Sequence, residues 1–274
     1  MYRMHIHVPL DKRYEPIDYI MGLGTISKVA MENLLAQMDD IQKSKSEKIE
    51  LQVVEPGQIA VVVVSPGKGL SRIFASLGAG AIVEGGQTMN PSTQEILAAF
   101  ENLPTDKVII LPNNRNIILA ANQAKEVTVK QVAVVPSKTV PQGLAAMLAH
   151  NPDGEVDAVA GKMSKSLASV QTGEITIATR TVEIDGVNVE TGQVIALLDG
   201  KLALAAASVE EAVVGFLEKA EAGKHELITF YYGEDLNRHE AFRIVDVARE
   251  KYSAQEIEVQ DGGQPHYPFL ISVE

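Results

Sequence analysis

Three polar loops carry the side chains in this sequence that could bind a ligand or a partner. They span residues 85–93 (GGQTMNPST), 112–116 (PNNRN) and 137–139 (SKT). Short hydroxyl and amide side chains at helix N-termini can hold a phosphate, a carboxylate or a partner's backbone, and the loops also supply two cations. The candidate binding residues are Thr88, Asn90, Ser92, Asn114, Arg115, Asn116, Ser137 and Lys138.

Each loop follows a short apolar run and precedes a helical pattern, so each is expected at the carboxyl end of a buried strand. Open α/β sheets place their ligands at those ends, which predicts one shared recognition surface. The same residue types also cap helices and close turns, and either of the first two loops alone favours that structural role. Three loops on one sheet edge strengthen the binding interpretation, and the sequence leaves both open.

Other chemistries have weaker support. His5 and His7 lie two apart, so on a strand both point to one face and could share a zinc ion. Two further ligands would be needed and none stands out, so a surface pair on an edge strand is favoured. No Asp-x-Asp cluster, cysteine or serine–histidine–carboxylate pattern is present, which argues against a complete ATP site or a nucleophilic enzyme. The glycine-rich stretches 65–71 and 78–83 lack the order of phosphate-binding fingerprints and are better explained as turns.

Strands and helices alternate regularly between the charged linker near residue 50 and residue 161. We therefore predict a parallel-sheet βαβ domain over 56–161, because such alternation implies right-handed crossovers. Residues 162–274 predict an α+β domain with a mixed or antiparallel sheet. Its expected elements begin with a helix over 163–170, a long strand over 174–184 and a hairpin turn at 185–186. Strands over 194–198 and 201–206 follow, joined by a turn at 199–200. Helices from 208 and over 237–251 and strands over 256–259 and 269–273 complete the domain. Residues 1–55 are interpreted as the end of a truncated domain.

The composition narrows the class of protein. The chain has 274 residues, 46% of them hydrophobic, enough for real cores in about two domains. No run of eighteen apolar residues predicts a membrane span, and no apolar segment near residue 1 resembles a signal peptide. A net charge of −12 argues against a nucleic-acid partner. We expect a soluble, cytoplasmic protein, and the sequence leaves a homodimer open.

Four motifs in order resemble one family. They cover 84–93, 111–117, 135–143 and 261–265, and they resemble the large kinase subunit of bacterial two-component fatty acid kinases. These proteins are also described as dihydroxyacetone-kinase-like or Dak phosphatase proteins. The resemblance covers essentially the whole chain. It implies a DegV- and dihydroxyacetone-kinase-like fold for the C-terminal region.

The resemblance also implies that different domains of these proteins carry catalysis and partner binding. In the family an N-terminal domain holds ATP and magnesium, and it phosphorylates the carboxylate of a fatty acid. This chain resembles the end of the middle domain plus the C-terminal region, which docks a fatty-acid-binding partner protein. His5 and His7 resemble paired histidines that, in the family, join a cysteine at a zinc site. That cysteine is not present here. We therefore expect no catalytic residue and no cofactor within this chain.

Two other functions stay open. The chain could be a DegV-like domain that itself holds a fatty acid or a small phosphorylated metabolite. It could also be a dihydroxyacetone-kinase-like enzyme. A phosphatase activity has neither a metal cluster nor a nucleophile pair in the sequence to support it.

Overall fold

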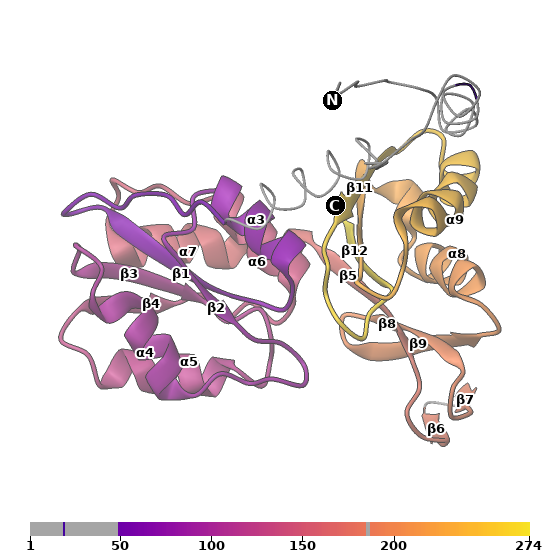
Figure 1. The fold of residues 1–274 in the computed structure, drawn as a ribbon, viewed down its shortest axis with the longest axis horizontal. Helices are drawn as coiled ribbons and strands as arrows, with labels where there is room; N and C mark the ends of the chain where they lie inside the picture. Colours follow the sequence, from indigo (N-terminus) through magenta and orange to yellow (C-terminus); the bar gives the residue numbers. More distant parts are fainter. Residues whose placement is uncertain (1–18, 20–48, 185–186) are drawn as a thin grey trace. The chain divides into compact units, whose positions relative to one another are not determined.

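The computed structural model describes Tyr19, residues 49–184 and residues 187–274 (Figure 1). The chain divides into two compact units, Met1–Lys48 and Ile49–Glu274. His5 and His7, with the edge strand predicted around them, lie outside the described residues. The second unit comprises two main sheets, each with its own helices, and a small two-stranded sheet.

The first sheet is parallel throughout. Its strand order is β2-β1-β3-β4, and every neighbouring pair is parallel, as predicted. All seven residues of β1 are buried, as expected for a strand covered by helices on both faces. The strands are β1 (Ile59–Ser65), β2 (Ala81–Glu84), β3 (Lys107–Leu111) and β4 (Gln131–Val134).

Helices cover both faces of this sheet (Figure 1). Successive residues of a strand point to opposite faces, so Val61 packs into one core with Phe74, while Val62 packs into the other with Phe100. The first core holds α3 (Lys68–Ser76), α6 (Val140–Leu148) and α7 (Val156–Ser166), and the second holds α4 (Thr93–Glu101) and α5 (Ile118–Glu126). The arrangement brings the carboxyl ends of all four strands to one edge.

The second sheet is mixed, as predicted. Its order is β11-β10-β12-β5-β8-β9, with β10 and β11 parallel and the other pairs antiparallel. Helices α8 (Val209–Lys219) and α9 (Arg238–Lys251) pack on one face around Phe216 and Phe230. The strands are β5 (Gln171–Ile177), β8 (Val194–Leu198), β9 (Lys201–Ala206), β10 (Leu227–Tyr232), β11 (Glu256–Asp261) and β12 (Phe269–Val273).

Two predicted elements are wrong in extent. The strand expected over 174–184 ends at Ile177, and a separate pair follows, β6 (Val182–Ile184) with β7 (Val187–Val189). The helix expected from Met163 begins at Val156, because Val156, Val159 and Met163 continue the apolar stripe that packs on the parallel sheet. That helix therefore crosses residue 161, where we placed a domain boundary. The limits of the predicted domains stay predictions.

The mixed sheet turns its second face toward the parallel sheet. Alternation along β5 sends Ile175 into the helix-covered core, whereas Thr172 contacts Thr139 on the parallel-sheet side, with hydroxyl oxygens 2.8 Å apart. Tyr231 and Leu270 likewise join the core built on α3, α6 and α7. These contacts fix the two sheets around the site described next.

Candidate functional site

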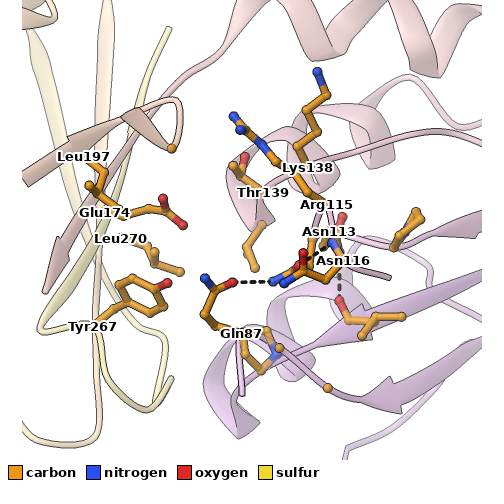
Figure 2. A pocket seen from close by; sticks show the side chains of 18 residues that line it. Gln87, Asn113, Arg115, Asn116, Lys138, Thr139, Glu174, Leu197, Tyr267 and Leu270 are labelled. Carbon is orange, nitrogen blue, oxygen red and sulfur yellow. Dashed lines mark hydrogen bonds between the residues drawn. The ribbon is translucent and has the colours of Figure 1, made fainter. Parts of the chain in front are cut away.

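A cavity of about 230 Å³ lies at the carboxyl ends of the parallel strands (Figure 2). The end of β1 and the loops after β2, β3 and β4 form one wall, and residues of β5, β8 and β12 form the other. The strand order reverses direction between β1 and β3, and open α/β sheets bind ligands at such a point. The polar or charged residues that line the cavity are Gln87, Asn113, Asn114, Arg115, Asn116, Lys138, Thr139, Glu174 and Tyr267.

Asn113 holds the strand ends together. Its side-chain amide donates to the Val64 carbonyl at 2.9 Å, and its Oδ1 accepts from the Ser137 hydroxyl at 2.7 Å. Its backbone N–H also donates to Ser137 Oγ at 3.0 Å. Asn113 has a φ of +53°, a left-handed conformation that asparagine tolerates better than most residues. This buried network joins β1, β3 and the loop after β4 beneath the cavity.

The neighbouring amides shape the cavity wall. Asn114 Oδ1 accepts from the Asn116 backbone N–H at 2.8 Å, and Asn114 Nδ2 donates to Gln87 Oε1 at 3.0 Å (Figure 2). Asn114 therefore ties the loop after β3 to the loop after β2. Gln87 Nε2 and the side chain of Asn116 have no hydrogen-bond partner among the described residues, so they can still bind a ligand.

Arg115 reaches from the parallel-sheet side to the turn between β8 and β9. Its guanidinium donates to the Asp199 carbonyl and packs against Gly200. Asp199 and Gly200 both have positive φ, as the predicted Asp-Gly hairpin requires. A Cβ on Gly200 would lie 2.9 Å from an Arg115 nitrogen, so the missing side chain also makes room for the cation.

Glu174 and Tyr267 project into the cavity from the mixed sheet (Figure 2). Burial raises the pKa of the Glu174 carboxyl, the nearby Arg115 charge lowers it, and the Asp199 charge raises it. Burial, followed by the charge of Glu174, raises the pKa of the Tyr267 hydroxyl. Ionisable groups with shifted pKa values in a cleft are typical of functional sites.

Four of the eight predicted binding residues line the cavity and four do not. Asn114, Arg115, Asn116 and Lys138 line the cavity, although Figure 2 shows the Lys138 amine directed away from Glu174 and Tyr267. The other four do not line it. Ser92 caps α4 in a reciprocal capping box, Ser137 is buried against Asn113, Thr88 Oγ1 lies 3.1 Å from His266 Nε2, and Asn90 is exposed. Their binding roles stay predictions.

Sequence reasoning missed the mixed-sheet wall of the cavity. Glu174 lay inside a predicted strand, and Tyr267 lay in the connection before the last strand. Neither has a loop motif to mark it. Gln87 stood within a motif that the prediction used, but the prediction selected hydroxyls and asparagines and passed over it. The burial of Glu174 was the missing signal, and only the packing of the mixed sheet against the parallel sheet supplies it.

Two features are absent from the described residues. No group of three or more His, Cys, Asp or Glu side chains there is placed to hold a metal ion. None of the helices in 49–184 and 187–274 combines the length and apolar character needed to cross a bilayer.

Comparison with protein families gives a match over most of the chain. Residues 60–274 match the model of the FakA-like family, which describes the C-terminal region of fatty acid kinase. The chain belongs to this family. The match covers both sheets and every loop that lines the cavity.

Similar proteins are longer than this chain. Protein YloV of Bacillus subtilis is 36% identical over 270 residues, which cover 98% of this chain and 49% of YloV. An uncharacterized protein of Staphylococcus saprophyticus is 33% identical over 272 residues, 98% of this chain and 49% of that protein. The chain thus spans about half the length of the curated relatives it matches.

Solved structures share the fold at low sequence identity. A DegV family protein of Corynebacterium glutamicum superposes with a TM-score of 0.57 at 16% identity, over 79% of this chain and 96% of that one. A Thermotoga maritima protein reported to bind fatty acid gives 0.55 at 10%, over 79% and 99%. The dihydroxyacetone kinase of C. freundii gives 0.54 at 11%, over 90% and 57%. The α/β fold is therefore that of DegV proteins and dihydroxyacetone kinases, as the sequence predicted.

Proposed function

We propose that this chain is the non-catalytic C-terminal module of a fatty acid kinase and that it docks a fatty-acid-binding partner protein. The observation that carries the proposal is the family match over residues 60–274 together with the loop surface that this region builds. ATP and magnesium would bind in the remainder of the longer protein. In this proposal the region of His5 and His7 contributes to a zinc site. The partner would meet the loops at the cavity rim.

The loop surface has the chemistry of a docking site. Arg115 and Asn116 are exposed at its rim, and Arg115 is anchored to the β8–β9 turn. A cation held in this way loses little conformational freedom on binding, and arginine is frequent among the residues that dominate protein interfaces. Met89, 51% exposed in the loop after β2, adds an apolar contact.

Binding of purified partner to the full-length kinase protein tests the docking role. We expect Arg115→Ala and Asn114→Ala to weaken binding by about tenfold or more each, the effect of losing one strong interface contact. Lys125→Ala and Asn122→Ala are matched controls on exposed positions of α5 away from the cavity. Melting temperatures check that each variant folds. Unchanged binding by both loop variants would exclude this surface.

ATP hydrolysis by the isolated 274-residue chain tests the non-catalytic role. We expect no turnover above a buffer control, with the full-length protein as the positive control. Turnover by the isolated chain would overturn the proposal.

A second candidate function is a DegV-like role in which the chain itself holds a fatty acid. The fold match with a fatty-acid-binding protein favours it. The cavity of about 230 Å³ is smaller than the roughly 300–1,000 Å³ of pockets that enclose drug-sized ligands. Native mass spectrometry separates the two: a co-purified acyl chain supports the second role, and a bare protein mass supports the first.

A further inference from the structure

The cavity has two walls of opposite character, and the charged side chains that they present to the cavity are not paired with each other. The parallel-sheet wall offers the Arg115 guanidinium and the amides of Gln87 and Asn116, and the mixed-sheet wall offers Glu174 and Tyr267 (Figure 2). Arg115 is close enough to favour the charged form of Glu174. No ion pair joins these two residues, and within the described ranges Glu174 forms none with any other residue. A gap therefore separates the two charges.

The groups on the mixed-sheet wall lack partners in the protein. No described residue donates a hydrogen bond to the Glu174 carboxylate, and no described residue pairs with the Tyr267 hydroxyl. Both side chains are half-buried. Neither side chain is among the fully buried polar groups without a partner, so water reaches both. A molecule that occupies the gap would replace that water and supply hydrogen bonds to both groups.

The hydrogen-bonding capacity of the two walls defines that molecule. The Tyr267 hydroxyl donates and the Glu174 carboxylate accepts, which together match a hydroxyl group, since a hydroxyl both accepts and donates. An ammonium group would satisfy Glu174 but would offer Tyr267 no acceptor. Opposite them, Arg115 has N–H groups beyond the one that donates to Asp199, and guanidinium groups bind carboxylates and phosphates well.

We propose that the cavity binds a short hydroxylated anion, either a polyol phosphate or a small hydroxy acid. Its anionic group contacts Arg115 and the amides of Gln87 and Asn116, and its hydroxyl lies between Glu174 and Tyr267. The volume of about 230 Å³ suits a molecule of this size. The anion site shares Arg115 and Asn116 with the proposed docking surface, whereas Glu174 and Tyr267 lie on the mixed-sheet wall only, so these two residues separate the ligand from the partner.

Titration calorimetry on the full 274-residue chain tests the proposal with four probes. Glycerol 3-phosphate and glycerate carry both an anion and hydroxyls, propyl phosphate lacks hydroxyls, and inorganic phosphate is the anion alone. We expect the tighter of the two hydroxylated probes to bind about tenfold or more better than propyl phosphate, the effect of hydrogen bonds to a charged group. Which hydroxylated probe binds better identifies the anion as phosphate or carboxylate.

Variants locate the binding in the cavity. Glu174→Leu and Tyr267→Phe should each reduce the preference for the hydroxylated probe to about threefold or less, and Arg115→Gln should weaken every anion about tenfold. Lys125→Gln removes an exposed cation outside the cavity and should change nothing. Equal affinity for glycerol 3-phosphate, glycerate and propyl phosphate, an unchanged preference in both mixed-sheet variants, or no binding of any probe at millimolar concentration would overturn the proposal. Partner binding by Glu174→Leu should match wild type, which separates this result from a failure of docking.

Discussion

Gly143 in α6 is the position where one added methyl group should most disturb the base of the cavity. A Cβ built there lies 2.0 Å from Asn113 Oδ1 and 2.8 Å from Asn113 Nδ2. Real Cβ atoms do not approach so closely, so Gly143→Ala must displace the Asn113 side chain. That side chain is buried and bonded to Val64 and Ser137, so it has no alternative position that keeps both hydrogen bonds.

The expected loss of stability follows from those two bonds. Each buried polar group left without its partner costs about 1–3 kcal/mol, and alanine in place of a helical glycine returns up to about 1 kcal/mol. The free energy of unfolding of Gly143→Ala should therefore fall by about 1–6 kcal/mol.

Urea denaturation followed by circular dichroism measures this change. Gly161→Ala is the matched control, because Gly161 is exposed in α7 and a Cβ there meets nothing within 4 Å. The control should be unchanged or more stable by up to about 1 kcal/mol. If Gly143→Ala is as stable as the control, Asn113 can move freely and the network does not fix the strand ends.

Two other substitutions test the charged side chains of Lys130 and Glu174. Lys130 Nζ donates to the carbonyls of Phe100, Leu103 and Thr105 at 3.0, 2.8 and 2.7 Å around the end of α4. Lys130→Met should lower the free energy of unfolding by about 1–3 kcal/mol in urea titrations, and a loss below that of the exposed control Lys125→Met would contradict the contact. Burial raises the folded-state pKa of the Glu174 carboxyl above its ordinary value of 4.5. The protonated carboxyl therefore favours the folded state, and this contribution to stability is fully present below pH 4.5. That contribution is lost as pH rises through the folded pKa, with a slope of at most about 1.4 kcal/mol per pH unit. Glu174→Gln should therefore match wild type near pH 4 and be more stable at pH 7, and equal stability at both pH values in paired melts would show that the carboxyl is not desolvated.

The sequence alone determined the elements and much of one wall of the site. Apolar runs such as 59–64 predict buried strands because a strand covered on both faces needs continuous hydrophobicity. Regular alternation with helices then implies a parallel sheet. Once the sheet is parallel, the loops after its strands must share an edge, so the sequence alone places Asn114, Arg115 and Asn116 near Lys138, and all four line the cavity.

The tertiary structure decided the other wall. Glu174 and Tyr267 reach the cavity through the antiparallel pairing of β5 and β12 and through the packing of that sheet against the parallel one. No local sequence pattern predicts that either residue lies in the cavity, because the burial of a single polar side chain depends on what packs over it. The strand β10 (LITFYY), an interior strand of its sheet, was also missed, and both of its neighbours, β11 and β12, come later in the chain. Local patterns fix which segments form strands, whereas contacts between distant segments fix which side chains meet.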